Sequence, residues 1–359
     1  MNRRKTTLGA ITAALTLTLV TACGSGSNQD DAATTKAVAD AATYSGADRQ
    51  QVLTTKAAKE SQLSIYTSMG LDDFNVFIEG FAELYPDIKV DVYSATGEKV
   101  VQRALTEYQA KRYDADVVLA PLTDVSHLLT AGDLQQYTSP EVPKGVDMST
   151  MGGAPVYLNR FVMAWNTDQV SAADVPTSYQ DLLDPKWQGK IGIEAGDVPW
   201  MATLFQAWGD EAATSYFEKL AAQKPFVQDS HTTLAELVGS GEVPLSPNVY
   251  DYDAEALKQS GAPIDWAPLD PLVVYPYVVG LPTHSAHPNA SMLFIDYLLS
   301  KKGQEGIAAL GRTPADPNTP PQEPGLQDIQ ALPTTSLDPA TWSKNLDKYN
   351  QIWQSLIRN

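Results

Sequence analysis

In the first third of the chain, segments with the apolar pattern of strands alternate with segments in which apolar residues have helical spacing. Residues 63–67 predict a strand, and residues 88–93 alternate between apolar and polar positions as strands do. Apolar residues recur every three or four positions in 74–84 and 100–108, which predicts two amphipathic helices. Residues 115–120 contain few polar positions, which is typical of a strand buried on both faces. This order predicts an α/β fold with a mostly parallel, doubly wound sheet.

The rest of the chain continues to mix the two kinds of element. Strands or extended runs are predicted at 155–166, 190–193, 243–246 and 265–282. Helices are predicted at 48–59, 201–208, 211–222, 232–238, 292–299 and 342–356. The run 265–282 is rich in proline, which favours extended structure over helix. Residues 315–339 have the composition of loops.

The N-terminus has the pattern of an export signal. Arg3, Arg4 and Lys5 precede an apolar stretch, 8–20, which is too short to span a membrane comfortably. Cys23 follows shortly after this stretch, and residues 20–23 resemble the lipobox of bacterial lipoproteins. We therefore expect a lipoprotein signal peptide at 1–22 and lipidation of Cys23 by acyl chains such as palmitate. An ordinary secretory signal, cut near the same place, is the alternative.

Residues 23–44 are rich in Gly, Ser, Asp, Ala and Thr. This composition predicts a flexible tether between the lipid anchor and the folded protein. No later apolar run is long enough to span a bilayer. The mature protein is therefore expected outside the cytoplasm, anchored to the outer face of the cytoplasmic membrane through the lipid alone.

Composition restricts the kinds of partner. Charged residues make up 19% of the 359 residues and apolar residues 43%, which fits a globular protein of about two domains. The formal net charge is −18, so the surface repels phosphate backbones and nucleic-acid binding is not expected. The single cysteine excludes an intramolecular disulfide and any cysteine-rich metal cluster.

Candidate ligand groups follow from the sheet topology. In doubly wound sheets, ligands bind beyond the carboxyl ends of the strands. The polar residues at these positions are Thr67, Ser68, Thr96, Glu98, Thr123 and Asp124. Hydroxyls and carboxylates also cap helices, so each residue alone has a structural alternative. Asp124 either binds a cationic solute or begins a helix at 125–129.

Several segments resemble one known family. Residues 63–68, 112–118, 183–191 and 286–304 are similar in order and spacing to the solute-binding lipoproteins of bacterial ABC importers, in the ferric-iron-type subgroup. The similarity extends from about residue 45 to residue 312. It implies a periplasmic-binding-protein type II fold, with a doubly wound sheet in each of two lobes that close around a solute by hinge bending.

Carried over to this sequence, the resemblance implies a division into lobes and hinges. Lobe one would hold 45–160 plus 281–359, and lobe two would hold 165–268. The hinge strands would be 159–166 and 269–280. The implied partners are a small solute and an ABC permease in the cytoplasmic membrane, and the receptor itself is expected to be a monomer.

The resemblance also points to Tyr250 and Tyr252. Ferric-binding relatives use a tyrosine pair in this region, and phenolate oxygen is a hard ligand that suits Fe(III). Asp251 separates these tyrosines, whereas the family's pair is adjacent, and positions i and i+2 of a regular helix point about 200° apart. One tyrosine in the cleft and one in the core is therefore the favoured arrangement.

Three further residues precede predicted helices in lobe two. They are Trp200, which could stack on a ring or a cation, and His231 and Thr232, at a helix start that offers free N–H groups. Packing is the structural alternative for each. His284 and His287 lie between Pro282 and Pro288 and are expected in a surface turn rather than in a zinc site.

No nucleophile elbow, phosphate loop or dinucleotide motif is present in the sequence. We therefore expect a receptor that is not an enzyme and requires no cofactor. Its solute is expected to be a ferric ion or chelate, or a small organic solute, with a cationic one favoured by Glu98, Asp124 and Asp251. A secreted cell-envelope hydrolase on an α/β fold is the alternative function.

Overall fold

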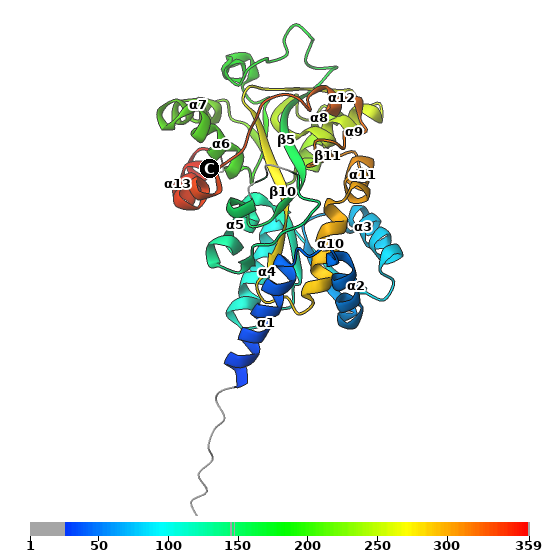
Figure 1. Cartoon of the computed structure of the whole chain (residues 1–359). Coiled ribbons are helices and arrows are strands. Elements are labelled where there is room, and N and C mark those ends of the chain that lie inside the picture. The colour runs from blue at the N-terminus through cyan, green and yellow to red at the C-terminus, as the bar shows by residue number, and fades with distance from the viewer. Residues whose placement is uncertain (1–25, 144–145, 147, 358–359) are drawn as a thin grey trace, which may run out of the picture.

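The computed structural model describes residues 26–143, 146 and 148–357, with side chains from residue 31 onward. Two halves are joined by two long strands, β5 (Ala154–Asn166) and β10 (Leu272–Pro282), which run through the middle of the molecule (Figure 1). The predicted α/β fold is confirmed. We call the half that contains β1–β3 lobe one and the half that contains β6–β9 lobe two.

Lobe one is built on a sheet with the order β11-β5-β10-β3-β1-β2. Its strands are β1 (Gln62–Thr67), β2 (Lys89–Ser94), β3 (Val117–Pro121) and β11 (Thr313–Pro314), with the short β4 (Leu134–Gln135) paired to β10. The first three are parallel, as predicted, and β10 joins β3 in the antiparallel direction. All three parallel strands therefore present their carboxyl ends at one edge of the sheet.

Helices cover both faces of this sheet because its side chains alternate between two cores. Ile65 packs with α2, α3 and α10, whereas Tyr66 packs with α4 and α5. The helices of lobe one are α2 (Arg49–Glu60), α3 (Leu71–Leu84), α4 (Gly97–Gln109), α5 (Leu122–Ala131), α10 (Pro288–Leu299) and α11 (Lys301–Ala309). Both α4 and α5 begin directly after a parallel strand, so their N-termini lie at the same sheet edge.

Lobe two continues from the far half of β5. There β8 (Leu245–Tyr250) and β9 (Ile264–Pro268) pair with β5 in the antiparallel direction. A separate parallel pair consists of β6 (Gly192–Glu194) and β7 (Phe226–Gln228). The surrounding helices are α6 (Val198–Trp208), α7 (Asp210–Ala222), α8 (His231–Ser240) and α9 (Asp251–Gln259).

The prediction of a flexible tether over 23–44 is wrong for most of that range. Residues Gly26–Thr43 form helix α1, and Val38, Ala41 and Ala42 are buried against the core of lobe one. The reason is that alanine, which dominates this stretch, has the highest helix propensity, and its small side chain allows close packing against α10. Cys23 and the signal peptide lie outside the described residues.

The assignment of all of 281–359 to lobe one is also corrected. Residues up to β11 do pack with lobe one, but α12 (Pro324–Asp328) places Leu326 in a lobe-two core, and β12 (Thr334–Thr335) pairs with β10. The last helix, α13 (Pro339–Leu356), packs its tryptophans on α6 and also contacts α5 of lobe one. In Figure 1 it lies beside α6, close to α5. No helix in the described part of the chain is both long and apolar enough to cross a membrane.

Candidate solute-binding site

A cavity of about 830 Å³ lies where the two lobes face each other. Three groups of residues line it: the N-termini of α4 and α5 from lobe one, the loops after β6, β7 and β8 from lobe two, and one side of α13. Tyr275, on β10, closes the cavity at the hinge, and its hydroxyl makes no hydrogen bond of ordinary geometry within the described structure.

The lobe-one wall contains four of the predicted residues. Thr96 and Glu98 come from the start of α4, directly after β2, and Thr123 and Asp124 come from the start of α5, directly after β3. The side chain of His127 lies one turn further along α5. The parallel arrangement of β2 and β3 brings these side chains together although they are distant in sequence.

Asp124 has the most perturbed environment on this wall. Its carboxylate lies against Gly97, where any side chain would overlap with it. Burial, and secondarily the charge of Glu98, raise the pKa of Asp124 to about 7. Burial also lowers the pKa of His127, which favours its neutral form. A positive charge in the cavity would remove the penalty on the ionised Asp124.

The lobe-two wall is also acidic. Glu194 ends β6, Asp197 precedes α6, and Asp229 and His231 flank the start of α8. Tyr250, the last residue of β8, lines the cavity beside them, with its ring stacked on His231 at a centroid distance of 3.8 Å. Carboxylates therefore face the cavity from both lobes.

Hydrogen bonds hold the lobe-two groups in place. His231 Nε2 lies 3.3 Å from an Asp197 oxygen, and the other Asp197 oxygen accepts a 2.6 Å hydrogen bond from the Asn248 side chain. The backbone N–H groups of Gly196 and Ser230 donate to the Glu194 carboxylate, at 2.5 and 3.1 Å. These contacts fix the orientations of both carboxylates and of the imidazole ring in the structure without a solute.

These contacts set the protonation of the pair. Burial raises the pKa of Asp197 to about 7, an increase that the charge of His231 partly offsets. Burial lowers the pKa of His231, but Asp197, together with Glu194 and Asp253, outweighs it and raises the value to about 9. At neutral pH His231 is therefore positively charged and sits among carboxylates.

The third wall comes from α13. Trp342, Leu346, Asn350, Trp353 and Gln354 line the cavity from one side of this helix. The indole N–H of Trp353 donates a 2.7 Å hydrogen bond to the carbonyl oxygen of Ala195, next to the acidic loop. This wall is uncharged, with apolar side chains between two amides, whereas the other two walls carry charges, so its apolar part suits the hydrocarbon part of a small solute.

Other predicted ligand residues lie elsewhere. Trp200 is fully buried in the aromatic core of lobe two, against Phe217 and Trp353, so the prediction that it faces a solute is wrong. Its position at a helix start did not reveal that this face of α6 packs inward. The Thr67 and Ser68 hydroxyls both contact the Tyr277 hydroxyl, at 3.0 and 3.1 Å, and neither lines the cavity.

The two tyrosines predicted as ligands of a ferric ion do not both face the cavity. Tyr250 lines the cavity and Tyr252 does not, although their rings are stacked 5.5 Å apart. The Arg312 guanidinium lies 4.4 Å from the Tyr252 ring centroid and pairs with Asp73. Burial raises the pKa of both phenols. Thr232 is exposed outside the cavity, with its hydroxyl 3.4 Å from an Asp253 oxygen.

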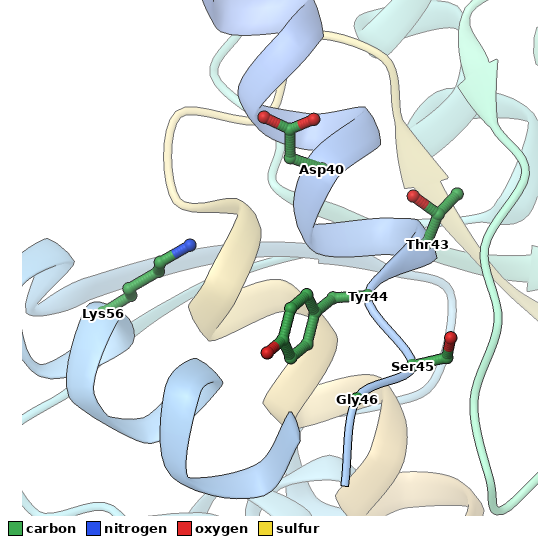
Figure 2. Close-up of a pocket in the computed structure, with 6 residues that line it drawn as sticks. All are labelled: Asp40, Thr43, Tyr44, Ser45, Gly46 and Lys56. Atoms are coloured by element: carbon green, nitrogen blue, oxygen red, sulfur yellow. The ribbon is translucent and has the colours of Figure 1, made fainter. Parts of the chain in front are cut away.

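Sequence reasoning missed Glu194 and Asp197. Both follow the strand predicted at 190–193, so the strand-end rule would have found them had it been applied to lobe two. It also missed the α13 residues, for which the sequence carries no signal, because their role depends on where the last helix packs. A separate shallow hollow between α1 and α2, lined by Tyr44 and Lys56 (Figure 2), lies away from the sheet edge and contains no buried charge.

Comparison with known proteins agrees with this geometry. Residues 123–340 match the family model described as bacterial extracellular solute-binding protein. A putative 2-aminoethylphosphonate-binding periplasmic protein of Salmonella typhimurium is 24% identical over 323 residues, which cover 82% of this chain and 94% of the relative. The family consists of transport binding proteins, so the hydrolase alternative is not supported.

Solved structures share the fold. Iron-bound HitA from Pseudomonas aeruginosa superimposes with a TM-score of 0.70 at 19% identity, covering 81% of this chain and 99% of that one. AfuA from Actinobacillus pleuropneumoniae, with exogenous fructose-6-phosphate bound, gives 0.71 at 23% identity, covering 83% and 98%. The predicted type II periplasmic-binding-protein fold is thereby confirmed. The chain belongs to the bacterial extracellular solute-binding proteins, the solute receptors of ABC importers.

Proposed function

We propose that the cavity captures a small organic solute with a protonated amino group. The observation that carries this proposal is the pair of acidic walls: Asp124 and Glu98 on lobe one face Glu194 and Asp197 on lobe two across the cavity. An ammonium group would keep Asp124 ionised and would donate hydrogen bonds to carboxylates of both walls only when both lobes are near it. The apolar side of α13 would cover the carbon skeleton.

The name of one relative supports an amine. The Salmonella relative is named for 2-aminoethylphosphonate, a small molecule with an amino group. A ferric ion is less favoured, because Tyr252 lies against the cationic Arg312 rather than in the cavity. The residues we propose as solute contacts are Thr96, Glu98, Thr123, Asp124, Asp197 and Tyr250.

We further propose that solute binding closes the lobes by bending at 159–166 and 269–280. Lobe one would then comprise 45–160 with the segment from 281 to β11, and lobe two 165–268 with α12. Because α13 contacts both α5 and α6, it would move with lobe two and slide against α5 during closure.

We infer that the mature protein begins at a lipidated Cys23, performs no chemistry on its solute, and delivers it as a monomer to a permease in the cytoplasmic membrane. The apolar segment 8–20 and the single cysteine at position 23 support the anchor. Metabolic labelling with a fatty acid tests it: the wild-type protein should incorporate label and Cys23→Ser should not. If the wild-type protein carried no label and was released into the medium as Cys23→Ser is, the lipid anchor would be contradicted.

A thermal-shift screen tests the solute class. The panel contains 2-aminoethylphosphonate, γ-aminobutyrate and putrescine as amines, fructose-6-phosphate as an anion, and ferric citrate. A ligand at 100 times its Kd should stabilise the protein by about 2.7 kcal/mol. We expect shifts from at least one amine. Shifts from the anion alone, or a shift from iron with tyrosinate absorption, would contradict the proposal.

A matched pair of variants localises the effect. Asp124→Asn removes one carboxylate charge from the lobe-one wall of the cavity and should abolish the amine shift. Asp87→Asn removes an exposed carboxylate near the opposite end of β2 and should leave the shift unchanged. Equal shifts in both variants would show that the amine binds outside the proposed site.

A further inference from the structure

We propose that Glu194, Asp197 and His231 form a binding site for a divalent transition-metal ion of the zinc class. One ligand atom from each residue lies within 4.8 Å of the others, on the lobe-two wall of the cavity. The site shares Glu194 and Asp197 with the lobe-two wall of the proposed amine site, but it requires no organic solute, so metal binding is tested on its own. The carboxylates are more than nine-tenths buried, and His231 is partly exposed to the cavity, through which an ion could enter.

The distance between His231 and Asp197 supports a shared ion. Two ligands on a tetrahedral metal with bonds of about 2.0–2.1 Å lie about 3.3 Å apart. The observed distance from Nε2 to the Asp197 oxygen is 3.3 Å. A charge-assisted hydrogen bond between an imidazolium and a carboxylate is usually shorter, about 2.7–2.9 Å. The distance is thus compatible with two ligands of one ion.

The surrounding hydrogen bonds orient each ligand as metal sites require. His231 Nδ1 lies 3.3 Å from the carbonyl oxygen of Asn248, and because a carbonyl only accepts, Nδ1 must carry the proton. Nε2 is then the ring nitrogen directed at Asp197, and a metal ion would bind there in place of the Nε2 proton. A carbonyl that anchors the other ring nitrogen is typical of a ligating histidine. Asn248 also donates to the far oxygen of Asp197, and the ring is fixed by stacking on Tyr250.

The donor set selects the kind of ion. One imidazole nitrogen with two carboxylate oxygens suits Zn²⁺ and its neighbours, whereas Ca²⁺ and Mg²⁺ prefer oxygen alone and Cu(I) prefers sulfur. Two carboxylates and a neutral histidine balance the charge of a divalent ion. With three protein ligands, a fourth position would remain open towards the cavity.

Two of the three histidines of lobe one, His284 and His287, lie outside the cavity and provide a control. His287 Nδ1 lies 2.7 Å from an Asp116 oxygen at the start of α10, and the His284 ring is stacked on Tyr113 at 4.1 Å. They lie at the base of lobe one, outside the cavity. If Zn²⁺ bound non-specifically to histidines outside the cavity, replacing His284 would weaken binding. Binding at the proposed site would not change.

Calorimetric titration of chelator-treated protein with Zn²⁺, and absorption spectra with Co²⁺, test the site. We expect one ion per chain and the visible bands of four- or five-coordinate Co²⁺. His231→Gln and Glu194→Gln should each weaken Zn²⁺ binding at least tenfold and remove the Co²⁺ bands, while His284→Gln should change neither. Absence of binding by the wild-type protein, or binding that survives both cavity substitutions, would overturn the site.

Far-UV circular dichroism of each variant shows whether it is folded. The Co²⁺ spectrum of the wild-type protein is decisive even if a variant does not fold, because octahedral, water-like bands would contradict the three-ligand site. The amine screen is run on the same chelator-treated protein. Loss of the amine shift and loss of metal binding are thus separate results.

Discussion

Replacement of Trp353 by alanine tests whether α13 is an integral wall of the cavity. The side chain is fully buried, contacts the rings of Trp200 and Phe217, and donates a 2.7 Å hydrogen bond to the Ala195 carbonyl oxygen. Large-to-small substitutions of buried tryptophan cost about 3–5 kcal/mol through lost burial and the remaining cavity. The unpaired carbonyl adds about 1 kcal/mol.

The expected result for Trp353→Ala is therefore a loss of about 4–6 kcal/mol in the free energy of unfolding. At about 2 °C per kcal/mol for a chain of this size, the midpoint in scanning calorimetry should fall by about 8–12 °C. Phe226→Ala is the control, because Phe226 is 44% exposed on β7 of the same lobe and should change stability by about 0.5 kcal/mol or less. A Trp353→Ala protein that melted like the control would refute the docking of α13.

Three further predictions concern charge. Because the pKa values of Asp124 and Asp197 are both about 7 and only the ionised forms attract an ammonium group, the affinity for an amine should fall at least about tenfold from pH 8 to pH 6 in calorimetric titrations, and an affinity that did not change with pH would contradict their role. Arg49→Met leaves Asp296 buried without its partner and should cost about 3–5 kcal/mol in urea unfolding, part of which Asp296→Asn restores. The hydrogen bond to Asp116 raises the pKa of His287 in the folded protein. Protonated His287 therefore stabilises the fold fully below about pH 6.5, and this stabilisation is lost as pH rises through the raised pKa. His287→Gln should reduce the free energy of unfolding by about 1.5–3 kcal/mol at pH 6 and by less at pH 9.

The sequence predicted the lobe-one part of the site because that part follows from local rules. Each of Thr96, Thr123 and Asp124 comes directly after a strand whose pattern is unambiguous, and parallel strands bring their carboxyl ends to one edge. Tyr250, at the end of β8, was predicted from the resemblance to ferric-binding relatives instead. No knowledge of distant contacts was needed for these residues.

The packing of the two terminal helices could not be predicted in this way. An Ala- and Thr-rich stretch has the composition of a linker and also of a helix, and only contact of Val38 and Ala42 with lobe one decides between them. The apolar stripe of α13 is evident in the sequence, but nothing there indicates that Trp342 and Trp353 pack on lobe two. Such assignments depend on tertiary contacts between segments far apart in the chain.

The extent of burial of single elements was also not predicted correctly. Residues 292–299 suggest an amphipathic helix, yet every residue of α10 is buried, because α1, α2, α3 and the sheet surround it. Trp200 has the sequence context of a helix start that faces a ligand, but its ring completes an aromatic core. A periodic pattern of apolar residues identifies a helix, but it does not show how many of the faces of that helix are packed against other elements.

The central claim is that an amine is held between acidic groups of two lobes, and a crystal structure of the protein with the amine that gives the largest thermal shift tests it most directly. The account predicts the ammonium nitrogen within about 3 Å of the Asp124 carboxylate, with a carboxylate of lobe two also in contact. An amine bound outside this cavity, or one whose nitrogen faces away from both acidic walls, would contradict it.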